Sequence, residues 1–69
     1  MRQVTRTEVV EELGEAFPGA GLSKGELVEE ARRRGIRSEV VRLLERLPER
    51  RYRHVRELWA HVPEVPVGT

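Results

Sequence analysis

The stretch "LSKGELVEEARRRGI" (residues 22–36) carries signals for both ends of one helix. Ser23, followed three residues later by Glu26, is a capping box, in which each side chain accepts a hydrogen bond from the other residue's backbone N–H. At the other end, Gly35 stands where a helix is commonly ended by a residue in the left-handed conformation. Three arginines in the last turn suit the negative end of the helix dipole. The stretch predicts a helix over residues 23–34.

Weaker signals of the same kind predict three more helices. Thr5 caps the first, Ser38 caps the third, and His54 stands at the N-cap of the fourth. Apolar residues recur at helical spacing in each segment, and no alternating pattern indicates a pair of strands. The predicted fold is all-α, a single domain over residues 1–69, with an extended tail over residues 62–69 because two prolines prevent a helix there. The four helices are expected over residues 5–17, 23–34, 38–47 and 54–62.

The apolar stripes of these helices predict one small core. Five large side chains are expected to converge in it: Phe17, Leu27, Leu44, Leu47 and Leu58. A chain of 69 residues buries only about 60% of its unfolded surface, so a homodimer that buries more is plausible.

The stretch "LPERRY" (residues 47–52) is interpreted as a connection between two helices. Pro48 forces the preceding residue out of the helical conformation. Tyr52 is expected to pack its ring on the core while its hydroxyl reaches a backbone group or water. The alternative is that Tyr52 stacks on a nucleic-acid base.

Several function classes are disfavoured by what the sequence lacks. It has no cysteine and no aspartate, and its two serines are expected to be helix caps. His54 and His61 are two helical turns apart without further ligands between them, so no metal site is expected. No catalytic residue, cofactor or small-molecule substrate is predicted. No leader and no apolar run of ~20 residues is evident, so the expected location is the cytoplasm, without a membrane contact.

Four segments of the chain resemble one family of small bacterial helical proteins. They are "FP" (residues 17–18), "ELVEEA" (residues 26–31), Gly35 and "VVRLLERLPERRY" (residues 40–52). Together they are similar to domain-of-unknown-function family 2795 over roughly residues 5–62. The resemblance implies a shared fold and no activity. Departures from the family pattern occur at Ile36, Glu49, Arg51 and His54, so a function shared by the family should not depend on Arg51.

The charges of the chain are unevenly distributed. Residues 1–31 hold three basic and seven acidic side chains, a sum of −4, whereas residues 32–56 hold ten arginines and three glutamates, a sum of +7. We expect a non-catalytic protein-interaction or scaffolding module that can associate with itself through complementary surfaces. Trp59 either completes the core or contacts a partner, since tryptophan is a common interface anchor.

The alternative function is sequence-tolerant nucleic-acid binding through arginine clusters within residues 32–56. Phosphate binding needs only grouped cations. Reading of the major groove by helix 38–47 is disfavoured, because Glu39 and Glu45 would face phosphates. The candidate contacts are Arg32, Arg33, Arg34, Arg50, Arg51, Arg53 and Arg56.

Overall fold

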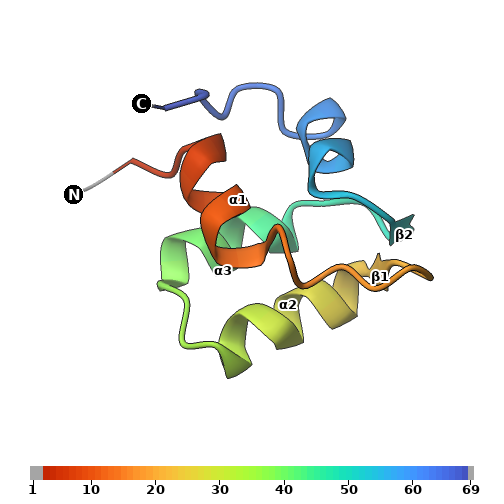
Figure 1. Cartoon of the computed structure of the whole chain (residues 1–69). Helices are drawn as coiled ribbons and strands as arrows, with labels where there is room; N and C mark the ends of the chain where they lie inside the picture. Colours follow the sequence, from red (N-terminus) through yellow and green to blue (C-terminus); the bar gives the residue numbers. More distant parts are fainter. Residues whose placement is uncertain (1–2, 69) are drawn as a thin grey trace.

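The computed structural model of the chain describes residues 3–68 (Figure 1). Its described part forms three α-helices, one 3₁₀-helix and two short strands. They are α1 (Arg6–Leu13), β1 (Leu22–Ser23), α2 (Lys24–Arg33), α3 (Ser38–Glu45), β2 (Arg51–Tyr52) and η1, the 3₁₀-helix (Val55–Ala60). Helices α2 and α3 pack on each other, and η1 packs between α1 and β2. The structure is compact and mostly helical, as predicted.

Both ends of α2 confirm the prediction from the sequence. The Ser23 side chain accepts a hydrogen bond from the Glu26 N–H (3.2 Å), and the Glu26 carboxylate accepts one from the Ser23 N–H (2.8 Å). At the C-terminus, Gly35 has a φ of 70°. The Gly35 N–H donates to the Arg32 carbonyl (3.1 Å), and the following N–H donates to the Ala31 carbonyl (3.0 Å). This is the Schellman arrangement, which satisfies carbonyls that the helix itself leaves unpaired.

Helix α1 begins as predicted but ends early. The Thr5 hydroxyl caps it by accepting a hydrogen bond from the Glu8 N–H (3.2 Å). The helix ends at Leu13 rather than at residue 17. Glycine at position 14 weakens the helix, and Pro18 excludes the helical conformation from the residue before it, so the sequence between them turns instead.

Helix α3 corrects the predicted cap. Ser38 is the first residue of the helix, and Arg37 is its N-cap without a side-chain capping hydrogen bond. The prediction of Ser38 as the cap was therefore wrong. The Arg37 guanidinium instead donates to both carboxylate oxygens of Glu8 on α1, at 2.6 and 2.8 Å. This contact fixes the turn between α2 and α3 against α1. The helix ends at Glu45, two residues before the predicted end.

A two-stranded antiparallel bridge corrects the prediction of a purely all-α fold. Leu22 lies opposite Tyr52 and Ser23 lies opposite Arg51. Two residues per strand are too few to leave an alternating pattern in a sequence, which is why the bridge was not predicted. The bridge ties the N-terminus of α2 to the segment that precedes η1 (Figure 1).

The core contains most of the predicted side chains. Leu27, Leu44, Leu47 and Leu58 are buried together, as expected. Phe17 is only partly buried and packs at the edge of this cluster. The other buried hydrophobic side chains are Val9, Leu13, Ala31, Ile36, Val40, Val41, Leu43, Tyr52, Val55, Val62 and Val65.

The described part of the C-terminal tail contains no helix, but it is not extended throughout, since the Val65 N–H donates to the Val62 carbonyl (3.2 Å) across a turn. The tail is also docked on α1. Its backbone carbonyls accept hydrogen bonds from the first turn of α1, where a helix leaves its N–H groups without internal partners. The Arg6 N–H donates to Pro66 (2.8 Å), and the Thr7 N–H donates to Val67 (3.0 Å). The Arg6 side chain also donates to the carbonyls of Val65 (2.8 Å) and Pro63 (3.1 Å). The tail is thus an integral part of the fold.

Candidate functional site

The seven arginines proposed as anion contacts fall into two groups at opposite ends of α2. The α2-end arginines, Arg32–Arg34, lie at the C-terminus of that helix. The β2-edge arginines are Arg50, Arg51, Arg53 and Arg56. Because β2 pairs with β1, the strand just before α2, this second group lies beside the N-terminus of α2 (Figure 1). A ten-residue helix is about 15 Å long, so the two groups do not form one continuous basic surface.

Carboxylates neutralise the α2-end arginines. Glu30 accepts hydrogen bonds from both Arg33 and Arg34, the latter at 2.6 Å. These two hydrogen bonds, the one from Arg34 first, hold the pKa of Glu30 below its usual value. Arg32 pairs with Glu45 on α3 at 3.1 Å. This end of α2 therefore has little uncompensated positive charge.

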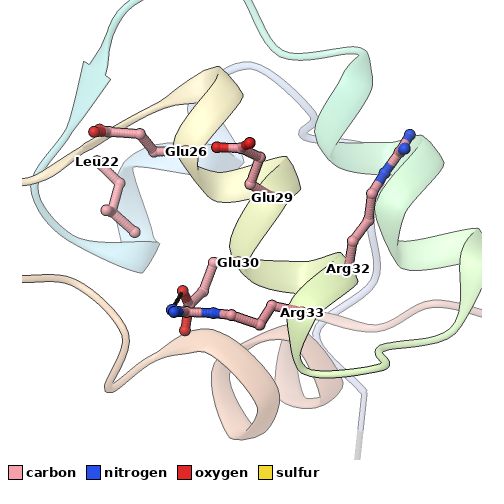
Figure 2. A pocket seen from close by; sticks show the side chains of 6 residues that line it. All are labelled: Leu22, Glu26, Glu29, Glu30, Arg32 and Arg33. Carbon is pink, nitrogen blue, oxygen red and sulfur yellow. Dashed lines mark hydrogen bonds and ion pairs between the residues drawn. The ribbon is translucent and has the colours of Figure 1, made fainter.

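Figure 2 shows how two of the α2-end arginines, Arg32 and Arg33, diverge. Arg32 extends toward α3, whereas Arg33 extends toward α1 and meets Glu30 there. The shallow pocket between them is also lined by Leu22, Glu26 and Glu29. Three carboxylates at its wall make the pocket unsuited to an anion, since like charges repel.

The β2-edge arginines are less compensated. Arg51 is the exception, because it pairs with Glu26 at 3.8 Å and donates to the carbonyls of Gly21 (3.0 Å) and Ala20 (3.3 Å) in the loop before β1. Arg50 lies over the ring of Tyr52, with the guanidinium carbon 5.8 Å from the ring centre. Within residues 3–68, the side chains of Arg53 and Arg56 form no hydrogen bond and no ion pair, and both are exposed.

Tyr52 confirms the structural interpretation of "LPERRY" and cannot stack on a base in this conformation. Its side chain is 0% exposed and is the largest of the fully buried side chains. Its hydroxyl donates to the Pro48 carbonyl at 2.8 Å, which closes the turn after α3. Burial raises the pKa of the Tyr52 hydroxyl above its usual value.

Trp59 has features of both roles considered for it, a core residue and a contact for a partner. Its ring packs on the core but is only partly buried, and the Arg6 guanidinium carbon lies 5.3 Å from its centre. It lines a depression of about 380 Å³ together with Arg6, Thr7, Val10, Glu11 and Val67. We call these six residues the α1–tail face. Val10 and Val67 are 44% and 66% exposed, and they are the exposed large hydrophobic residues of the described chain.

Two contributors to the α1–tail face were not predicted from the sequence. Helical spacing assigns Val10 to the buried stripe of the first helix, and no signal in the sequence indicates a contact for the tail. Val67 is held in place because its carbonyl accepts hydrogen bonds from the Thr7 N–H (3.0 Å) and the Thr7 hydroxyl (2.8 Å). Thr7 and Val67 are 60 positions apart, so their hydrogen bonds leave no local signal in the sequence. The one related feature of the sequence is a threonine in the first turn of a helix, which can donate a hydrogen bond to another segment.

The two histidines have local contacts. The Nδ1 atom of His54 accepts a hydrogen bond from the Arg56 N–H (3.2 Å) and caps η1, as predicted. The ring of His61 meets that of Tyr52 edge-on, with the ring centres 5.9 Å apart. The described residues contain no group of three histidine, cysteine or acidic side chains that could hold a metal ion. No helix among them is long and apolar enough to cross a membrane.

Comparison with known proteins places the chain in a family. The family model described as protein of unknown function, DUF2795, matches residues 4–59. The chain belongs to this family. The match covers every helix and both strands except the last residue of η1, and the docked tail lies beyond it. Searches of curated proteins and of solved structures gave no match. Membership of the DUF2795 family thus confirms the resemblance seen in the sequence.

Proposed function

We propose that the protein is a non-catalytic interaction module that associates with a second copy of itself through the α1–tail face. The observation that supports this proposal is the gathering of Val10, Val67 and Trp59 around one depression. Tryptophan is enriched among the residues that contribute most to binding at interfaces, and contiguous exposed apolar side chains mark interaction surfaces.

The charged rim of this face suits a two-fold symmetric contact. In such a dimer, if residue i of one copy contacts residue j of the other, then residue j of the first copy also contacts residue i of the second. Arg6 uses Nε and one Nη for the carbonyls of the tail, and a guanidinium has five N–H donors. Glu11 is exposed and has no partner in the described part of the chain. Glu11 of one copy can therefore pair with Arg6 of the other.

The size of the face sets the expected affinity. Stable interfaces use about 20–30 residues on each side, and smaller contacts are typical of transient complexes. A face centred on six residues should give a dissociation constant on the order of 10–100 µM or weaker, or about 5–7 kcal/mol. Self-association should thus appear only in concentrated samples.

Sedimentation velocity over a series from about 10 µM to about 1 mM, which brackets that constant, tests the proposal. The sedimentation coefficient should rise with concentration for the natural chain. The double variant Val10→Gln/Val67→Gln should stay monomeric, because it removes the apolar contact without adding charge. Ala20→Gln, an exposed change on the loop before β1, is the matched control and should dimerise like the natural chain.

The single tryptophan gives a second, local readout. Fluorescence of Trp59 should change over the concentration range in which sedimentation detects the dimer, since the ring lies in the contact. A chain that stays monomeric at every concentration contradicts the proposal. So does a dimer that forms equally well with the double variant.

A further inference from the structure

Three of the four β2-edge arginines, Arg50, Arg53 and Arg56, have no ion pair with a carboxylate within the described residues, whereas Arg51 lies 3.8 Å from Glu26. Residues 50–56 hold four arginines and a histidine with no acidic residue among them. We propose that Arg50, Arg53 and Arg56 bind the sugar–phosphate backbone of double-stranded nucleic acid. This inference concerns a different surface from the α1–tail face and does not depend on the proposed dimer.

A nucleic-acid backbone should bind at the β2 edge rather than at the α2-end arginines, because the latter are already paired with carboxylates. There, Glu30 and Glu45 already occupy the guanidinium groups. A phosphate at that end would have to displace an existing ion pair. At the β2 edge, the flanking Glu57 carboxylate accepts a hydrogen bond from the backbone N–H of Arg53 (2.8 Å). This carboxylate is therefore bonded to the backbone of Arg53 and forms no ion pair with its guanidinium.

The backbone that presents these arginines is held in place. Tyr52, which separates Arg50 from Arg53, is fully buried and pairs with Leu22 across the bridge. Val55, just before Arg56, is buried as well. Residues between the arginines are thus anchored in the core while the arginines themselves remain in solvent. A preorganised backbone lowers the entropy lost on binding.

The chemistry of the surface favours a phosphate backbone over other anionic partners. A guanidinium matches the geometry of a phosphate with two parallel hydrogen bonds. Strong contacts to an acidic peptide usually need an apolar or aromatic anchor as well, and both Tyr52 and Val55 are buried here. A single strand is also disfavoured, because stacking on bases needs an exposed aromatic ring and Tyr52 is not exposed.

Counterion release gives the proposal a numerical test. Each phosphate neutralised on a duplex contributes about −0.9 to the slope of log K against log salt concentration. Three arginines predict a slope of about −2.7, which weakens binding about 40-fold between roughly 50 and 200 mM salt. Removing two of them should reduce the slope to about −0.9 and the loss to about 3.5-fold.

The experiment is a fluorescence-anisotropy titration of a labelled duplex of arbitrary sequence with the whole chain at both salt concentrations. The double variant Arg53→Gln/Arg56→Gln should bind more weakly and show the smaller salt dependence. Arg32→Gln/Arg33→Gln is the matched control, since it removes the same net charge from the other end of α2. It should retain the salt dependence of the natural chain.

Three results would overturn the proposal. One is no binding of the duplex by the natural chain at the lower salt concentration. Another is an equal loss in both double variants, which would indicate attraction by net charge alone. The third is displacement of the duplex by poly-glutamate at an equal concentration of charges, which would indicate an acidic protein partner. Circular dichroism of each variant checks that the helices are retained, and all four substituted side chains are exposed.

Discussion

One methyl group added at Gly21 should strongly destabilise this fold. Its φ is 82°, a conformation that side chains disfavour. A Cβ atom there would lie 2.6 Å from the carbonyl oxygen of Tyr52 and 3.1 Å from the Cγ atoms of Arg51 and Arg53. The substitution Gly21→Ala therefore combines backbone strain with a collision against β2.

The two costs can be estimated separately. The left-handed conformation costs an alanine about 1–2 kcal/mol. Relieving the collision requires a shift of β1 against β2, and overpacking of this kind typically costs about 1–3 kcal/mol. The sum is about 2–5 kcal/mol. A chain of 69 residues is expected to have a total stability of about 3–10 kcal/mol, so the variant should lose a large part of it.

Two other glycines serve as controls in the same denaturation experiment. Gly35 has a φ of 70°, but a Cβ atom added there would meet no atom within 4 Å, so Gly35→Ala reports the backbone strain alone. Gly25 lies in α2 with ordinary φ and open space, and Gly25→Ala should stabilise the chain by up to about 1 kcal/mol. Urea unfolding followed by circular dichroism gives all three values. A loss for Gly21→Ala no larger than that for Gly35→Ala would refute the close approach of β1 to β2.

Three further changes test other contacts of the fold. Tyr52→Phe removes the hydrogen bond to the Pro48 carbonyl and should reduce the free energy of unfolding by about 1–2 kcal/mol in urea. Deletion of residues 63–69 should cost about 2–4 kcal/mol, measured in the same way, because it removes carbonyl partners of α1 and a buried valine. The hydrogen bond from the Ser23 N–H lowers the pKa of Glu26 below its usual value of 4.5. This interaction therefore stabilises the fold fully at pH values above 4.5, and the stabilisation is lost as the pH falls through the lowered pKa of the folded state. The urea midpoint should therefore fall less on acidification in Glu26→Gln than in the natural chain, and equal falls would exclude this contribution.

The ends of α2 show what a sequence of this kind reveals. The signals at Ser23, Glu26 and Gly35 are local, since each capping contact joins residues no more than five positions apart. Local contacts of this type depend little on the rest of the chain, and the structure contains them as predicted. The apolar stripes likewise depend only on helical spacing, which explains the correct prediction of most of the core.

The early end of α1 has a local cause, but three other differences from the prediction depend on contacts between distant residues. Ser38 has the right chemistry for a cap, but Arg37 takes the position because its guanidinium reaches Glu8 on α1. The bridge between β1 and β2 joins residues 28 and 30 positions apart, and its strands are too short for an alternating pattern. The basic segment of residues 32–56 is continuous in sequence, and its division into two groups depends on which carboxylates lie nearby in space. None of these contacts has a counterpart in local sequence.

The docked tail belongs to the folded domain, although it lies beyond the residues that the family model matches. The DUF2795 match ends at residue 59, yet Val62 and Val65 are buried in the same core as the matched helices. The tail also accepts hydrogen bonds from the first turn of α1. An ion pair between Glu64 and Arg46, the C-cap residue of α3, ties the tail to that helix (2.6 Å). A fragment cut at residue 59 would expose the core on one side and leave the start of α1 without its partners. It would also lose Val67 from the α1–tail face, so any comparison of binding between this chain and such a fragment must first show that the fragment is folded.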